Sequence, residues 1–299
     1  MYTFSTLPIE LVYRILDHLS AFTLFCSMQN VCQRFNQILN IYHPYQYTTH
    51  SNHPTIRTLP QESSDKQRFL FSLHEPRSNT FTHYRNTSCI MLYLIEKHYS
   101  KTLTTLDLGY NQIGHQGAQH IGDALRINTT LTTLNLWYSQ IGDQGAQHIC
   151  DALRINTTLT ALDIGYNKIG DQGAQHICDA LRINTTLTAL HIGYNKIGDQ
   201  GAQHIGDALR INTTLTTLDI GGNQIGDQGA QHIFDALRIN TTLTTLDLRC
   251  NRIGHQGAQH IGDALRINTT LTTLNLGING IGARERSYLR NTFGNRLTW

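Results

Sequence analysis

Six histidine residues recur along the second part of the chain at intervals of 28 residues. They are His120, His148, His176, His204, His232 and His260. Imidazole is a common protein ligand for zinc, so this row raises the question of a metal site. The pattern around the row predicts one helix per interval, and packed helices lie about 10 Å apart, whereas zinc–nitrogen bonds are about 2.0–2.1 Å long. We therefore expect a surface row of histidines and no metal site.

The cysteine and glycine patterns predict no reaction either. Cys150 and Cys178 occupy equivalent positions on what should be adjacent helices, too far apart for a disulfide. The segment 165–172, GYNKIGDQ, has spaced glycines but lacks the Lys and Ser/Thr that a phosphate-binding loop needs. The sequence contains no evident nucleophile with a placed base, no carboxylate pair and no metal cluster. We expect no catalytic residues, no cofactor and no enzymatic activity.

The histidines belong to a 28-residue unit whose first copy, at 103–130, reads LTTLDLGYNQIGHQGAQHIGDALRINTT. Six full copies begin at Leu103, Leu131, Leu159, Leu187, Leu215 and Leu243, and a truncated seventh begins at Leu271. A fixed period of 20–50 residues is typical of a solenoid, in which each unit buries its apolar face against its neighbours.

Within each unit the apolar period changes from that of a strand to that of a helix. In the first copy these residues are Leu106 and Leu108 at strand spacing, then Ala118, Ile121 and Leu125 at helical spacing. Asp143, Asp171, Asp199 and Asp227 are expected to cap the N-termini of their own helices. Because strands pack about 4.8 Å apart and helices about 10 Å apart, the stack must curve with its strands innermost. The sequence predicts an α/β solenoid in the form of a horseshoe.

The pattern LxxLxLxxNxIG resembles the leucine-rich repeat, and the 28-residue length with GDQG before the helix resembles the ribonuclease-inhibitor type. The resemblance covers residues 103–282. It implies that an asparagine of the motif binds main-chain groups where the chain leaves the sheet, which suits an amide that both donates and accepts. This structural asparagine ladder comprises Asn111, Asn167, Asn195, Asn223, Asn251 and Asn279. Ser139 interrupts it, so the second repeat is expected to be locally looser.

The first forty residues follow a different pattern. Residues 7–40, LPIELVYRILDHLSAFTLFCSMQNVCQRFNQILN, place apolar side chains on one helical stripe and then on a second. They resemble an F-box, which implies docking on a Skp-type adaptor and, through it, on a cullin-based ubiquitin ligase. The resemblance implies that the adaptor is contacted by Leu7, Pro8, Leu11, Ile15, Leu16, Leu19, Val31 and Phe35. The alternative interpretation is a plain helical hairpin that caps the solenoid.

The remaining segments are expected to connect or cap these two units. We assign 1–45 to the F-box and 46–85, rich in Ser, Thr, His, Asn and Pro, to a linker or irregular segment. Residues 86–102 contain the apolar run SCIMLYLIEKHY and are expected to form an N-terminal cap helix. Residues 283–299 depart from the repeat and are expected to form a C-terminal cap, with a basic helix near 283–291.

The copies differ mainly at positions on or beside the expected concave face. Aromatic side chains gather in the first four copies and arginines in the sixth, and Trp, Tyr and Arg are the usual anchors of protein interfaces. The candidate target-binding residues are Tyr110, Trp137, Tyr138, Asp163, Tyr166, His191, Tyr194, Asp219, Arg249 and Arg252. Two alternatives stay open: the tyrosines stack only on one another, or the differences are drift after recent duplication.

Charge and composition narrow the classes of partner. Residues 103–270 carry 10 Lys and Arg against 14 Asp and Glu, a mildly acidic balance that argues against nucleic acid. No long apolar run or signal-peptide pattern is present, so we expect an intracellular protein, cytoplasmic or nuclear, with no membrane partner. The leading hypothesis is a substrate receptor of a cullin-based ligase with an unknown protein target. The alternatives are a stand-alone inhibitor or scaffold, or an accessory to a GTPase.

Overall fold

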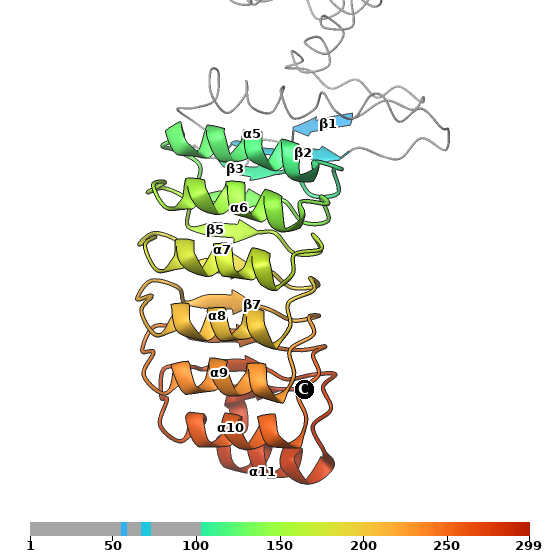
Figure 1. The fold of residues 1–299 in the computed structure, drawn as a ribbon, viewed down its shortest axis with the longest axis vertical. Helices are drawn as coiled ribbons and strands as arrows, with labels where there is room; N and C mark the ends of the chain where they lie inside the picture. Colours follow the sequence, from blue (N-terminus) through green and yellow to red (C-terminus); the bar gives the residue numbers. More distant parts are fainter. Residues whose placement is uncertain (1–54, 59–66, 73–102) are drawn as a thin grey trace, which may run out of the picture.

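The computed structural model describes residues 55–58, 67–72 and 103–299, the first two stretches by their backbone alone. The F-box segment 1–45 and the expected cap helix within 86–102 lie outside the described residues. The described chain forms a solenoid with one layer of strands and one layer of helices (Figure 1). The predicted α/β solenoid of 28-residue strand–helix repeats is therefore confirmed.

Each repeat contributes one short strand and one helix. The strands are β3 (Leu103–Asp107), β4 (Thr133–Asn135), β5 (Ala161–Asp163), β6 (Ala189–His191), β7 (Thr217–Asp219), β8 (Thr245–Asp247) and β9 (Thr273–Asn275). The helices are α5 (Gly114–Ile127), α6 (Gly142–Leu153), α7 (Asp171–Leu181), α8 (Asp199–Leu209), α9 (Asp227–Leu237), α10 (His255–Leu265) and α11 (Ala283–Phe293).

The strands form one sheet in chain order, and β2 to β10 are parallel. Equivalent residues pair across neighbouring repeats, as Leu134 does with Leu162, so equivalent side chains line up in rows along the solenoid. At the N-terminal edge, β2 (Gln67–Ser72) pairs with β3 and β1 (Thr55–Thr58) runs antiparallel to β2. These two strands lie within 46–85, which the sequence suggested to be linker or irregular.

The core lies between the two layers and is built from the apolar positions of the repeat. Leu134 at the centre of its strand is fully buried, and Ile149 and Leu153 of the following helix belong to the same buried cluster. Burying such a side chain contributes about 1.5–3 kcal/mol, and truncating it to alanine typically costs about 2–5 kcal/mol. Rows of identical leucines therefore hold adjacent repeats in one register.

From the third repeat onward, an asparagine joins each strand-to-helix turn to the preceding repeat. The Nδ2 of Asn167 donates to the carbonyl oxygens of Leu136 (2.8 Å) and Gly165 (2.9 Å). Its Oδ1 accepts from the backbone N–H groups of Ser139 (2.9 Å) and Ile141 (3.2 Å). Corresponding bonds to the preceding repeat are made by Asn195, Asn223, Asn251 and Asn279.

Ser139 replaces this asparagine in the second repeat. Its buried hydroxyl lies 3.2 Å from the carbonyl oxygen of Leu108 and 3.3 Å from that of Trp137, and it has one proton to donate. The shorter side chain brings no acceptor to Ile113, whose N–H lies 2.6 Å from the Asn111 carbonyl oxygen instead. The junction between the first two repeats thus lacks a side-chain acceptor that the later junctions have.

The aspartates of the first helical turn do not cap their own helices. Asp171 is the first residue of α7. The N-cap residue is therefore Gly170, which has extended backbone geometry. The Oδ1 of Asp143 in the preceding helix accepts from the N–H groups of Gly170 (2.7 Å) and Gly173 (3.0 Å). The same two bonds to the next helix are made by Asp171, Asp199 and Asp227. The expected capping was wrong in its direction, because each carboxylate caps the neighbouring helix.

A second row of asparagines lies where the helices end. The Oδ1 of Asn156 accepts from the N–H groups of Thr158 and Leu159, and its Nδ2 donates to the carbonyl oxygens of Leu125 and Asn128. Asn184, Asn212, Asn240 and Asn268 also bind the preceding repeat in this way. These side chains are 4–6% exposed, so the recurring Asn-Thr-Thr has a structural role.

At the C-terminal end, α11 lies against α10, and β10 (Leu297–Thr298) closes the sheet beside β9. Leu289 of α11 is fully buried. Trp299 packs back onto the last repeat, with the guanidinium groups of Arg286 and Arg290 at 5.6 and 5.9 Å from its ring centre. The terminal residues therefore cover the end of the core.

Arg296 lies 28 residues after Asn268, at the position equivalent to the helix-end asparagine, and makes the equivalent hydrogen bonds. Its guanidinium donates to the carbonyl oxygens of Leu265 (3.2 Å) and Asn268 (2.8 Å), which are the positions that Asn268 itself binds one repeat earlier. Its Nε also donates to the Leu271 carbonyl oxygen at 2.7 Å. One arginine therefore satisfies the last carbonyl groups of the array.

Candidate protein-binding surface

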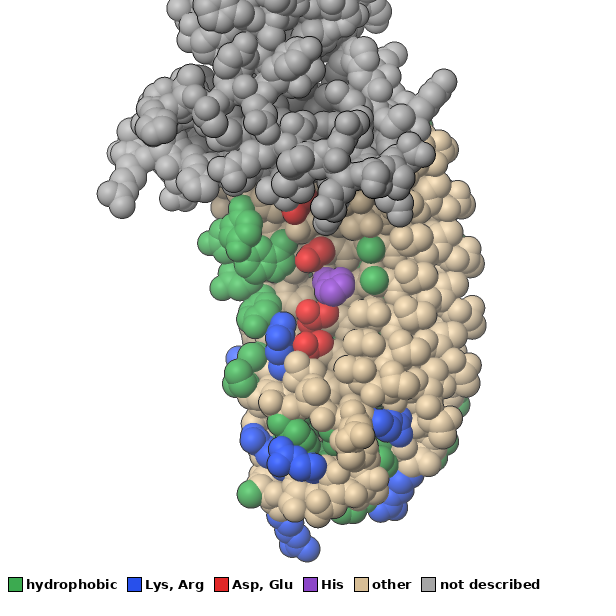
Figure 2. Space-filling model, turned by 180° about the vertical axis from the view of Figure 1, so that it is seen from behind, with side chains coloured by type: hydrophobic (Ala, Val, Ile, Leu, Met, Phe, Trp, Pro, Cys, Tyr) green, Lys and Arg blue, Asp and Glu red, His purple; other side chains and the backbone are tan. Residues whose placement is uncertain are grey.

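The last residue of each strand from β3 to β9 lies on the strand face, the sheet surface that points away from the helices. We call four of these residues, Asp107, Asp163, Asp219 and Asp247, the acidic row; Figure 2 shows carboxylates in one column with a histidine among them. Each aspartate is held by its own chain, as when the Oδ1 of Asp163 accepts from the N–H of Gly165 at 2.9 Å. That bond leaves the other oxygen for contacts on the face.

His191 occupies the acidic row between Asp163 and Asp219. Its Nδ1 lies 3.8 Å from the Asp219 Oδ2, and this carboxylate raises the pKa of His191, with Asp163 and Asp247 adding to the effect. Burial opposes ionisation of Asp219, but the neighbouring His191 and the Gly221 N–H outweigh burial and lower the pKa of Asp219. When His191 is protonated, its charge partly offsets that of Asp219 in the middle of the row.

Arg249 neutralises the C-terminal part of the row. Its Nε lies 3.3 Å from the Oδ2 of Asp247, and the same oxygen accepts from Asn275 at 3.1 Å. Burial nevertheless raises the pKa of Asp247, and burial also raises the pKa of Asp163. Asp107 adds to the rise for Asp163, so these carboxylates repel one another across the sheet. Within residues 103–299, neither Asp107 nor Asp163 forms an ion pair with Lys or Arg, so this end of the row attracts positive charge.

Beside the acidic row lies the aromatic cluster, which consists of Tyr110, Trp137, Tyr138, Tyr166 and Tyr194. The Tyr110 and Trp137 rings meet edge to face at 4.7 Å, and Trp137 lies 5.3 Å from Tyr166. Successive tyrosine rings lie 5.5, 5.1 and 5.6 Å apart. The four tyrosines remain 41–61% exposed, so the rings contact one another without being covered.

The tyrosines stand at a backbone position that disfavours any side chain. Their φ angles lie between 53° and 60°, in the left-handed region, and Gly222 has a φ of 66° at the equivalent position of the fifth repeat. That region costs an L-residue about 1–2 kcal/mol relative to right-handed geometry. Since about half of each tyrosine is exposed, burial offsets only part of this cost. Ring stacking is worth about 0.5–1.5 kcal/mol, which is comparable with this cost, and Cys250 and Ile278 adopt the same geometry in the last two copies.

Glycines make room for the rings in the neighbouring repeats. A Cβ at Gly165 would lie 2.7 Å from the indole Cδ1 of Trp137, and one at Gly222 would lie 2.5 Å from the ring of Tyr194. The indole of the second repeat therefore lies across the third, and the last tyrosine of the cluster lies across the fifth. The cluster thus spans repeats one to five.

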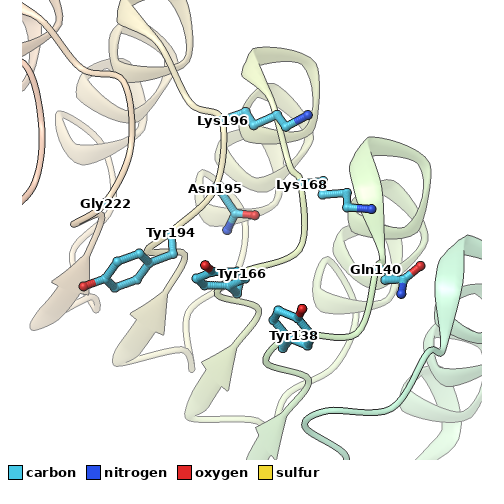
Figure 3. A pocket seen from close by; sticks show the side chains of 8 residues that line it. All are labelled: Tyr138, Gln140, Tyr166, Lys168, Tyr194, Asn195, Lys196 and Gly222. Atoms are coloured by element: carbon cyan, nitrogen blue, oxygen red, sulfur yellow. The ribbon is translucent and has the colours of Figure 1, made fainter. Parts of the chain in front are cut away.

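An open groove with a volume of about 350 Å³ runs along the tyrosines on the side of the helices. Its lining residues are Tyr138, Gln140, Tyr166, Lys168, Tyr194, Asn195, Lys196 and Gly222. Figure 3 shows the tyrosines at the ends of successive strands and the two lysines on the loops that lead to the helices. The groove therefore has aromatic rings on one side and ammonium groups on the other.

The structure brings most of the predicted target-binding residues onto one surface. Arg249 lies in the sheet region beside Asp247, whereas Arg252 lies in the loop position that Lys168 and Lys196 occupy in earlier repeats. The predicted adaptor-binding residues lie outside the described residues. Sequence reasoning missed the two lysines, although their position, directly after the ladder asparagine, also varies between copies.

The described residues show no arrangement suited to catalysis. No group of three or more His, Cys, Asp or Glu side chains in 103–299 could hold a metal ion. Cys150 and Cys178 are free and fully buried, and burial raises the pKa of both thiols. Among the helices that the structure describes, none is long and apolar enough to cross a membrane.

Comparison with protein families places domains at both ends of the chain. The F-box domain model matches residues 4–47, and a leucine-rich-repeat model matches 99–122 and 128–150. The model of the leucine-rich domain of the TMOD/LMOD family matches 167–292. A search of curated protein sequences found no match.

Two solved structures resemble the solenoid. The structure titled leiomodin-1 actin-binding site 2 shares 24% identity and a TM-score of 0.44, covering 51% of this chain and 88% of that one. The tropomodulin C-terminal domain of Caenorhabditis elegans shares 13% identity and a TM-score of 0.44, covering 50% and 92%.

The repeat geometry and the matched models define a leucine-rich-repeat protein. With the F-box domain that precedes the repeats, the chain has the arrangement of an F-box/leucine-rich-repeat protein. Proteins with this pairing of domains are generally adaptors that bind other proteins.

Proposed function

We propose that this protein is the substrate-recognition subunit of a cullin-based ubiquitin ligase. The F-box, which we place at 1–45, binds a Skp-type adaptor, and the strand face of the repeats, 103–282, binds a protein target. The observation that supports this most directly is the F-box match at residues 4–47, upstream of a solenoid with an exposed aromatic cluster. The chain itself performs no chemistry in this proposal.

The proposed mechanism is proximity. The adaptor holds the chain on the ligase, the aromatic cluster and the acidic row hold the target, and the ubiquitin-carrying enzyme modifies lysines of that target. Tethering raises the effective concentration of the reacting groups, which accelerates transfer without a catalytic residue in the receptor. The segments 46–85, 86–102 and 283–299 serve as connection and as caps in this arrangement.

Capture of the adaptor tests the proposal. The intact chain should bring down a Skp-type adaptor together with a cullin, and a Leu7→Ala/Pro8→Ala/Leu11→Ala variant should lose both. A matched control replaces three exposed helix residues of the repeats, Gln119→Ala/Gln147→Ala/Gln175→Ala, and should capture the adaptor normally. Circular dichroism of each variant checks that the solenoid is folded. Absence of capture by the intact chain would leave a leucine-rich-repeat binding protein with a helical N-terminal module.

A further inference from the structure

Three rows of side chains run side by side along the solenoid. The acidic row comes first along each repeat, the tyrosines of the aromatic cluster follow three residues later, and a basic row follows after the ladder asparagine. The basic row consists of Lys168, Lys196 and Arg252, all of them exposed. Because equivalent residues pair in register across β3 to β9, the three rows keep this order along the stack. A partner lying along the solenoid meets negative charge on one side and positive charge on the other.

The spacing of the tyrosines favours one kind of partner backbone. Successive rings lie 5.5, 5.1 and 5.6 Å apart. One turn of an α-helix advances about 5.4 Å, so a helix parallel to the row presents one side chain to each ring. In an extended chain, residues on one side recur every ~6.6 Å, and the mismatch would reach about 3–4 Å over three steps. The row therefore matches a helix and not a strand.

We infer that the aromatic cluster docks an amphipathic α-helix of the target, running along the solenoid. Apolar side chains at every turn of that helix lie on the tyrosines, basic side chains along one flank face Asp107 and Asp163, and acidic side chains along the other flank face Lys168 and Lys196. This inference rests on the proposed function of the strand face as a target-binding surface. It adds the conformation and the charge pattern of the bound segment.

The charge pattern follows from what is already neutralised on the protein. Arg249 and, when protonated, His191 partly compensate Asp247 and Asp219, so among the side chains that the structure describes the strongest attraction for a cation lies at the N-terminal end of the acidic row. The aromatic cluster lies beside this N-terminal end of the acidic row. The faces of its tyrosine and tryptophan rings also attract cations. A helix with basic residues on both flanks would press one flank against the lysines, and an acidic helix would press one flank against the aspartates. Like charges placed opposite each other disfavour both of these partners.

Synthetic helices with designed flanks test this inference. The probe is an 18-residue peptide with capped ends, leucine at one position per turn, lysine on one flank and glutamate on the other. Two further peptides carry lysine on both flanks or glutamate on both flanks, and a fourth has the composition of the probe with proline inserted to prevent a helix. Binding to the full-length chain is measured by fluorescence anisotropy. The mixed-flank helix should bind about tenfold more tightly than each of the other three.

Each proposed contact is tested by substituting a residue that another copy of the repeat carries at the equivalent position. Asp107→Asn/Asp163→Asn retains the bond to the backbone, as Asn135 and Asn275 do naturally, and should weaken the mixed and all-lysine peptides. Lys168→Gln/Lys196→Gln should weaken the mixed and all-glutamate peptides only. Tyr166→Gly/Tyr194→Gly suits the left-handed backbone, as Gly222 does, and should abolish binding of every helix without unfolding the repeats.

Equal binding of the four peptides, failure of the mixed helix to bind, or unchanged binding by the glycine variant would overturn the inference. Adaptor capture by the same preparations separates this result from the proposed function. A chain that captures the adaptor but shows no preference among peptides retains the receptor assignment and loses the helix-docking surface. A chain that fails to capture the adaptor loses the ligase assignment whatever the peptides do.

Discussion

At the scale of single residues, Ser139 distinguishes the first junction of the array from the later ones. Replacing it with asparagine should restore the amide oxygen that accepts from the preceding repeat elsewhere, as Asn167 does for Ile141. One or two added hydrogen bonds should raise the free energy of unfolding by about 1 kcal/mol. Chemical denaturation measures the gain, and hydrogen exchange at the Ile113 amide should slow. Ser139→Ala is the matched control, which loses the hydroxyl and should be less stable than the native protein.

His191 carries a prediction about pH. The nearby Asp219 raises the pKa of His191, so the folded protein holds this proton more tightly than the unfolded chain does. The resulting stabilisation is complete below the unfolded pKa of about 6.5 and disappears as pH rises through the higher folded pKa. Titration of the imidazole by nuclear magnetic resonance should give a pKa above 6.5, with the resonance identified by its absence in His191→Asn.

Two substitutions in the acidic row check the cause of that shift. Asp219→Asn removes the carboxylate 3.8 Å from the ring and should lower the pKa of His191. Asp107→Asn removes a carboxylate three strands away and should leave the value nearly unchanged. A His191 pKa that fell equally in both variants would point to the overall charge of the face and away from the specific pair.

At the scale of elements, the helices are capped by their neighbours. Asp199→Ala should remove two hydrogen bonds to the start of α9 and lower the free energy of unfolding by about 1–2 kcal/mol. Hydrogen exchange should accelerate at the Gly226 and Gly229 amides, while Gly201 in the helix of Asp199 itself keeps its bond to Asp171. Asp263→Ala, at an exposed site on α10, is the control and should change stability by less than about 0.5 kcal/mol. Faster exchange confined to α8 would contradict capping between repeats.

The sequence was enough to predict the order of elements because periodicity alone separates strand from helix in each copy. Leu106 and Leu108, then Ala118, Ile121 and Leu125, are buried as their spacing predicts. Capping by Asp143 was assigned to its own helix because local sequence contains no sign of the N–H donors that lie 27–30 residues further along the chain. The lysines of the groove were missed because their nearness to the tyrosines depends on how the loop turns after the left-handed residue. Strands β1 and β2 were missed because two strands of four and six residues within a segment rich in polar residues and breakers give a weak periodic signal, and β2 is fixed by pairing with the edge of the repeat sheet.

At the scale of the whole molecule, every repeat depends on the next for part of its hydrogen bonding. The ladder asparagines, the helix-end asparagines and the capping aspartates all bind across a junction, beyond the apolar core that adjacent repeats share. In such an array, stability is close to a sum of repeat and junction terms, and the ends decide where unfolding begins. The order of the strand face over repeats one to five therefore depends on stable ends of the array, including the C-terminal end, which is distant from the aromatic cluster.

Arg296 closes the C-terminal end of the array, so its removal should destabilise the last repeats more than the others. Arg296→Ala leaves the carbonyl oxygens of Leu265, Asn268 and Leu271 without their guanidinium donors, which should cost about 2 kcal/mol. Hydrogen exchange should accelerate in α10 and α11 first, while amides of α6 and α7 keep their native protection. Arg296→Lys, which retains the charge but not the fork of three donors, should recover only part of the loss. Uniform acceleration across all helices would mean that the array unfolds as one cooperative unit, and peptide binding at the distant aromatic cluster would then weaken in the same variant.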